Sequence, residues 1–171
     1  MVALAQTSIV LLLVVASISD AANLRQDQHD SSAMAQENQF STALLVRVNK
    51  ERAAHGLAPV CSNKKLQAAA ERHVQDQSKT DYVSDTGTDD STPETRVTDA
   101  GYKWQSVRET IGAGNANADD MVDWWMKTAS REIVLGKFTM AGSAYAYNAN
   151  TYSKHYWVQV FGTGSSEACD A

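Results

Sequence analysis

The fold and the candidate site of this chain are best predicted from one stretch, residues 84–114, SDTGTDDSTPETRVTDAGYKWQSVRETIGAG. The stretch contains a loop rich in turn residues, then a Thr92-Pro93 step that favours a helix start, then a run typical of a strand. Asp85 in the loop and Glu109 in the strand are the two side chains able to meet across a cleft. Because no histidine accompanies them in the stretch, the ordinary structural role of each is favoured, as a turn-capping aspartate and a solvent-exposed strand glutamate.

Two amphipathic helices are predicted before this stretch. Apolar residues repeat every four positions from Phe40 to Val48, and Gly56 is expected to end that helix. Ser62 is the expected N-cap of the second helix. His73 lies on the apolar face of the second helix, so we expect a hydrogen-bonded core histidine in preference to a metal ligand.

A third helix and a hairpin are predicted after the stretch. Asn117 is the expected N-cap of the helix, with Trp125 buried and Trp124 beside the buried face. Residues 138–147 and 154–162 form two strands, and the second is largely apolar on both of its faces. Such a strand requires cover on both sides. The predicted fold class is therefore α+β, a three-layer α-β-α sandwich with a small antiparallel sheet between helices.

Length and the N-terminal pattern set the domain organisation. The 171 residues are 43% hydrophobic, enough for one domain with a buried core. An apolar run from Ile9 to Val15 is too short to span a bilayer and is followed by small residues typical of a signal-peptidase site. The prediction is a signal peptide at residues 1–21, a flexible polar leader at 22–38 and one domain at 39–171. The protein is then secreted and extracellular, with no membrane span.

Charge and cysteine content restrict the partners. The net charge is -5 and no Lys/Arg cluster is present, which argues against nucleic acid and against anionic membrane surfaces. The chain has two cysteines, and export through an oxidising route makes a disulfide between Cys61 and Cys169 the default expectation. A monomer is expected.

Several motifs, taken in order, resemble one family. These are LLVRVNKERAAHGLAPV, KKLQAAAERHVQDQ, SDTGTDDSTPETRVTDAGYKW, ETIGAG, VDWWM and YWVQVFG, and the resemblance extends over about residues 39–162. The set resembles the CAP superfamily of cysteine-rich secretory proteins, antigen 5 and class 1 pathogenesis-related proteins, in its microbial SCP-like branch. The resemblance implies an α-β-α sandwich, secretion, and a cleft in which two histidines and two acids often hold a divalent metal.

The metal-binding motif of the family is incomplete in this sequence. Asp85 stands where the resemblance places the first histidine, Glu109 matches a family acid, and residues 128–131 contain no second histidine. Two oxygen ligands without imidazole or thiolate do not suit zinc, whereas a weak oxygen-ligated Ca²⁺ or Mg²⁺ is left open. We therefore expect a metal-free cleft and no cofactor. Arg131 is a candidate to approach the cleft and pair with Asp85 or Glu109.

The leading functional hypothesis is a secreted, non-enzymatic binding protein with a degenerate metal site. Its expected targets are a lipid, a cell-surface or cell-wall component, or a host protein, which includes a role as a virulence factor. Sterol is ranked below other lipids, because residues 127–136 are short and lack the aromatic side chains of the sterol-binding loop in relatives. The alternative is a protease-like hydrolase that uses the central cleft, although the Gly-x-Ser-x-Gly and His-Glu-x-x-His motifs are absent from the sequence.

Overall fold

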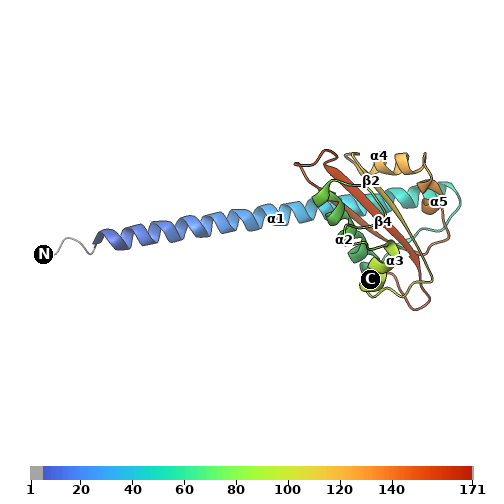
Figure 1. Ribbon diagram of the computed structural model, residues 1–171, viewed down its shortest axis with the longest axis horizontal. Helices are drawn as coiled ribbons and strands as arrows, with labels where there is room; N and C mark the ends of the chain where they lie inside the picture. Colours follow the sequence, from blue (N-terminus) through green and yellow to red (C-terminus); the bar gives the residue numbers. More distant parts are fainter. Residues whose placement is uncertain (1–5, 171) are drawn as a thin grey trace. The chain divides into compact units, whose positions relative to one another are not determined.

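The computed structural model describes residues 6–170, with side chains described for residues 24–26, 28, 31, 32 and 34–170 (Figure 1). The chain divides into two units, residues 1–36 and 37–171, and the second unit contains the folded core. The elements are α1 (Gln6–Ala54), β1 (Cys61–Ser62), α2 (Lys64–Thr80), α3 (Pro93–Asp99), β2 (Ser106–Ala113), α4 (Ala118–Trp125), α5 (Ser130–Val134), β3 (Met140–Tyr147) and β4 (His155–Thr163).

The N-terminal part of the chain forms a longer helix than the sequence pattern predicted. Helix α1 begins at Gln6, well before the apolar repeat that starts at Phe40, and residues 22–38, predicted as a flexible leader, are helical. The segment contains neither Gly nor Pro and is rich in Ala and Gln, which favour a helix even where side chains stay exposed, as Leu24 and Met34 do. The predicted signal peptide, residues 1–21, lies outside the residues whose side chains are described and stays a prediction.

The strands form one four-stranded sheet in the order β1-β3-β4-β2. β3 and β4 pair antiparallel as the predicted hairpin, and β2 pairs antiparallel with β4 at the edge. The sheet was expected to be entirely antiparallel, but the two-residue β1 adds a parallel pair with β3, in which Cys61 lies opposite Met140. So short a strand has no sequence pattern of its own, because its partner lies almost eighty residues further along the chain.

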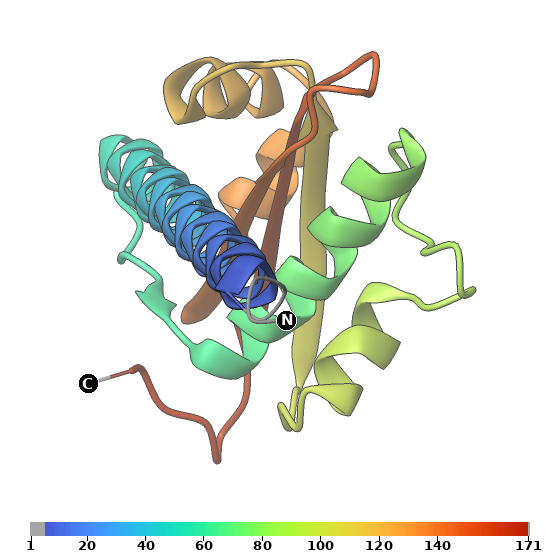
Figure 2. The same cartoon turned by 90° about the vertical axis from the view of Figure 1, so that its left-hand side faces the viewer.

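Helices cover both faces of the sheet, as predicted. One face packs on α2 and α3, and the core there includes Leu66, Val97 and Val158. The other face packs on α4, α5 and the C-terminal part of α1, around Trp125 and Trp157. Figure 2 shows α2 and α3 together on one side of the strands. This confirms the three-layer α-β-α architecture.

The helix caps determine where the loops around the sheet begin. Asn117 caps α4, and Thr92 with Pro93 begins α3, both as predicted. The predicted cap of α2 is wrong by one residue, because the Asn63 side chain accepts from the amides of Lys65 and Leu66 while the Ser62 hydroxyl donates to Asp170 instead. An Asn that reaches two amides satisfies more of the free N–H groups at a helix start than a serine bonded elsewhere.

Candidate functional site

The two predicted cleft residues line the same cavity. Asp85 is exposed in the loop after α2, and Glu109 projects from β2 with a buried side chain. The cavity has a volume of about 330 Å³, and its remaining walls come from the loop, the start of α3, β2 and α5. The strand and the loop are therefore brought together as the sequence suggested, with Glu109 at the inner wall and Asp85 at the rim.

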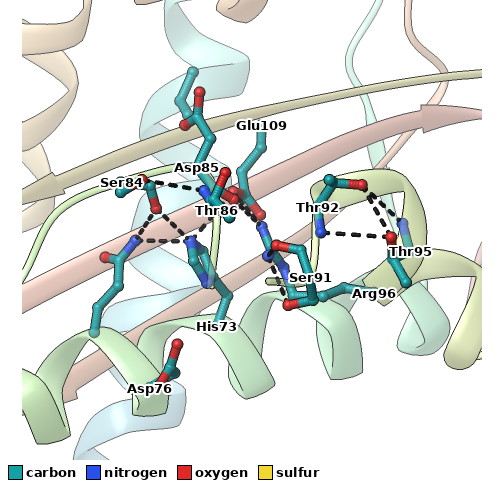
Figure 3. A network of polar contacts seen from close by, with 12 residues as sticks. His73, Asp76, Ser84, Asp85, Thr86, Ser91, Thr92, Thr95, Arg96 and Glu109 are labelled. Carbon is teal, nitrogen blue, oxygen red and sulfur yellow. Dashed lines mark hydrogen bonds and ion pairs between the residues drawn. The ribbon is translucent and has the colours of Figure 1, made fainter. Parts of the chain in front are cut away.

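Glu109 is held by an arginine that the sequence motifs did not indicate. Nη2 of Arg96, on α3, lies 2.9 Å from Oε1 of Glu109, and both side chains are buried (Figure 3). The same guanidinium donates to the carbonyls of Asp85 and Ser91 and to the Ser91 hydroxyl. Arg96 therefore ties the loop that carries Asp85 to the strand that carries Glu109. The available signal was its place in the helix, because Arg96 precedes the buried Val97 on the inner face of α3.

His73 completes the buried cluster. As predicted, it is a core histidine on α2, 1% exposed, with Nε2 2.8 Å from the Ser84 carbonyl and 2.8 Å from the amide nitrogen of Gln77. The same Nε2 lies 3.6 Å from Oε1 of Glu109. Burial, and next the charge on Arg96, lower the pKa of His73 to about 4. His73 is therefore neutral near pH 7 and does not form a second ion pair.

The environment of Glu109 favours its protonated form. Burial raises the pKa of Glu109 to about 8, since desolvation outweighs the attraction of Arg96, and the nearby Asp85 carboxylate adds to the increase. Four buried polar atoms of the cluster, His73 Nδ1, Gln77 Oε1, Arg96 Nε and Glu109 Oε2, have no hydrogen-bond partner among the described residues. The cluster thus keeps hydrogen-bonding capacity next to the cavity, and Glu109 is able to exchange a proton near neutral pH.

Arg131 does not occupy the place suggested for it. Its Nη2 lies 3.0 Å from Nε2 of His55 at the end of α1. Within the part of the chain that the structure describes, no ion pair joins Arg131 to Asp85 or Glu109, so the proposed cleft ion pair is wrong. The reason is α5, a short helix that the sequence pattern did not predict. It directs Ile133 into the cavity wall and Arg131 towards α1.

The Cys61–Cys169 disulfide is present, with a Cα–Cα distance of 5.6 Å. It joins β1 to the C-terminal segment, where Asp170 also bonds Ser62 and the amide of Lys64. The two bridged cysteines are separated by 108 positions in the sequence. On the chain-entropy model such a cross-link stabilises by roughly 4–5 kcal/mol. Its role is to hold the C-terminal segment against the sheet.

The residues of the cavity do not fit the divalent metal that the family often holds. Among the described residues, no group of three or more His, Cys, Asp or Glu side chains is arranged to bind an ion. Glu109, the one matching acid, has the Arg96 guanidinium 2.9 Å from its oxygen. A dication bound to that carboxyl would lie beside a fixed positive charge in a buried site, where repulsion is poorly screened. Protonation, which its raised pKa favours, makes Glu109 a still weaker ligand for a metal ion.

Comparisons with known proteins agree with the fold and the motifs. The model of the CAP, or cysteine-rich secretory protein, family matches residues 45–161, and the chain belongs to this family. No curated protein matches the chain by sequence. In the part of the chain that the structure describes, no helix has the length and apolar character needed to cross a membrane.

Three solved structures share the fold. An extracellular protein containing an SCP domain from Bacillus anthracis is 21% identical with a TM-score of 0.66, over 75% of this chain and 41% of that one. An outer surface protein from Borrelia burgdorferi is 16% identical with a TM-score of 0.66, over 73% of this chain and 92% of that one. A cysteine-rich secretory protein from Staphylococcus aureus is 15% identical with a TM-score of 0.61, over 75% and 40%. The chain thus spans less than half of the Bacillus and Staphylococcus proteins.

Proposed function

We propose that this chain is a secreted, non-enzymatic CAP-domain protein that binds a lipid, a cell-surface or cell-wall component, or a host protein. The observation that carries the proposal is the buried Arg96–Glu109 pair. In it, the acid that matches the family's metal ligand is bonded to a guanidinium of the protein itself. This cleft is therefore suited to binding organic groups and not to activating a water molecule on a metal ion.

The charge of the cavity favours one kind of target among these. Away from the Arg96–Glu109 pair, two carboxylates, Asp85 and Glu94, line the cavity together with one guanidinium, Arg108. This part of the lining, away from Arg96, attracts a positively charged group and disfavours a phosphate or a fatty-acid carboxylate. A cell-surface or host protein that presents a Lys or Arg side chain therefore fits this cleft better than an anionic lipid.

Secretion is supported by two independent features. A disulfide is typical of proteins that fold in an oxidising compartment. The three structural neighbours are, by their names, extracellular, outer surface or secretory proteins. We expect the mature protein to begin at Ala22, which N-terminal sequencing of the secreted form tests. A mature form that retains residues 1–21 would contradict the signal-peptide assignment.

Metal binding is the decisive test of the cleft. Calorimetric titration of the full mature chain with Zn²⁺ is expected to give no saturable heat at micromolar concentrations, because the guanidinium of Arg96 opposes the ion. Native mass spectrometry of the secreted protein should likewise show no stoichiometric metal. Stoichiometric zinc that is lost in Glu109→Ala but kept in Arg72→Met, a change to an exposed arginine, would overturn the proposal.

A hydrolase is the second candidate, and the Glu109 carboxyl is the observation that favours it. A buried carboxyl with a pKa of about 8 on a cavity wall has the properties of a general acid or base. The hydroxyls that line the same cavity belong to Thr86 and Thr92, and Thr92 is used to cap α3. A panel of peptide and ester substrates is expected to be left intact. Hydrolysis that is lost in Glu109→Gln would establish the enzyme instead.

A further inference from the structure

A second cavity lies away from the central cleft and has a different chemistry. Its volume is about 340 Å³, within the range of small-molecule sites, and it is bounded by α1, β1, α2 and β3. β1 pairs with β3 over only two residues, and beyond this short pairing the start of α2 packs next to β3. Gly142 of β3 permits this arrangement, because a Cβ there would be 2.0 Å from the backbone of Leu66 in α2. The first turn of α2 thus closes one wall.

The lining of this cavity is polar and uncharged. Six of its side chains are hydroxyls or amides, and the other two, Leu45 and Ala141, are apolar. The hydroxyls and amides are those of Asn38, Ser41, Thr42, Ser62, Gln67 and Ser143. An uncharged lining of this kind provides no compensation for the desolvation of an ion. A neutral ligand with several hydrogen-bonding groups is therefore favoured.

The hydrogen bonds within the protein orient several of these groups as acceptors. The Ser41 hydroxyl donates to the Glu37 carbonyl at 2.8 Å, and the Ser62 hydroxyl donates to the Asp170 carboxylate at 2.9 Å. Gln67 donates its amide to Glu71 at 2.8 Å. Because the hydroxyl protons of Ser41 and Ser62 are engaged, their oxygens retain lone pairs for a ligand O–H, and the side-chain oxygen of Gln67 accepts as well, while its second amide N–H is a further donor.

Ser143 has the opposite arrangement. Its Oγ accepts from Nε2 of the fully buried Gln159 at 3.0 Å, and no acceptor for its own proton is found among residues 37–170. The Ser143 hydroxyl is therefore a donor whose proton is free for a ligand, and the bond from Gln159 strengthens it. Oε1 of Gln159, next in this row, is itself buried without a partner in the described part of the chain.

We propose that this cavity binds a neutral monosaccharide. A sugar hydroxyl both donates and accepts, which matches acceptor oxygens on Ser41, Ser62 and Gln67 beside donors such as the Ser143 hydroxyl, and the C–H face of the ring suits the apolar contacts with Leu45 and Ala141. The site is separate from the charged cleft, so it does not depend on what the cleft binds. It adds a carbohydrate to the possible recognition targets of the protein.

Saturation-transfer NMR on the full mature chain tests this, with methyl glycosides of glucose, galactose, mannose and N-acetylglucosamine as probes and glucuronate as the charged comparison. At least one neutral glycoside is expected to bind saturably and glucuronate at least roughly tenfold more weakly, as an ion in an uncharged site should. Ser143→Ala is expected to weaken binding roughly tenfold by removing a donor that has no acceptor in the described part of the protein. Ser106→Ala, on β2, should leave binding unchanged.

Two further variants keep the result interpretable. Thr42→Leu adds bulk to the cavity from the exposed side of α1 without altering the core, so it should abolish binding in a protein with a native circular dichroism spectrum. Glu109→Gln should leave sugar binding unaffected. Absence of saturable binding by every neutral glycoside would overturn the proposal, as would binding that is lost in Glu109→Gln and kept in Thr42→Leu, which would place the sugar in the charged cleft.

Discussion

The two faces of the sheet carry polar clusters of opposite character, and both pass through β2. Glu109 and Thr110 are neighbours in sequence, so their side chains point to opposite faces. Glu109 faces α2 and α3, where it meets Arg96 and the neutral His73. Thr110 lies opposite Gln159, which lies opposite Ser143, so that an uncharged polar row crosses three strands on the other face.

The difference between the clusters shows what each requires from the fold. A buried guanidinium is tolerated because it makes hydrogen bonds to the Glu109 carboxyl, two carbonyls and a hydroxyl, and these bonds position the loop at residues 85–91. The neutral row has one hydrogen bond between side chains, from Gln159 to Ser143, and a long one from the Thr110 hydroxyl to the Gln159 carbonyl, and it leaves Gln159 Oε1 without a partner among the described residues. Stability and pH dependence should therefore reside in the charged cluster, while the neutral row should tolerate substitution.

The largest effect is expected from Arg96→Met, which keeps much of the side-chain volume and removes the charge. Glu109 and two loop carbonyls then lose their donor, and because each buried acceptor left unpaired costs about 1–3 kcal/mol, the free energy of unfolding should fall by about 3–5 kcal/mol. The matched control is Arg72→Met, which removes an exposed arginine paired with Asp89 and Asp99 and should cost about 0–1 kcal/mol. Urea denaturation measures both. Equal costs would mean that the buried pair has no special role.

An intermediate effect concerns pH. The folded pKa of Glu109, about 8, lies above its ordinary value of 4.5, so its contribution to stability is full below pH 4.5 and is lost as the pH rises through 8. His73 has the opposite sign, because its folded pKa of about 4 lies below 6.5 and its contribution is lost as the pH falls from 6.5 through 4. Of these two groups, only Glu109 changes the free energy of unfolding between pH 6.5 and 8.

The free energy of unfolding should therefore decrease from pH 6.5 to pH 8 in the wild-type protein. Glu109→Gln keeps an acceptor for Arg96 but does not titrate, and it should flatten this part of the profile. Arg72→Met should retain the wild-type slope. Denaturant titrations at closely spaced pH values provide the measurement, and a slope that persists in Glu109→Gln would assign the pH dependence to another group.

Most of the fold was predictable, because its signals are local. The alternation of residues 154–162 and the caps at Thr92 and Asn117 each act within a few residues, and each predicted an element that the structure contains. Elements without a local signal were missed. β1 has only two residues and depends on pairing with β3, and α5 has no side-chain cap to mark its start.

The candidate site was predictable only in part, for a related reason. Asp85 and Glu109 were found because they occupy motif positions, and the structure places both on one cavity. The partner of Glu109 depends on the direction in which a short helix points its side chains. The sequence suggested Arg131 as the partner of Glu109, whereas Arg96, 13 residues before Glu109, makes the contact. A charged residue on the inner face of a helix was the clue available.

The smallest effect is expected from a matched pair of glutamine substitutions, one on each face. Gln159 and Gln77 are both fully buried. Gln159→Leu removes one hydrogen bond together with the partnerless Oε1, so the change in the free energy of unfolding should stay within about 1 kcal/mol of zero. Gln77→Leu withdraws the donor to the Ser84 carbonyl and the contact with His73, leaving polar groups of the charged cluster unsatisfied, and should cost about 1–3 kcal/mol. The same denaturation measurements compare them, and a larger cost for Gln159→Leu would show that the neutral row is as demanding as the charged cluster.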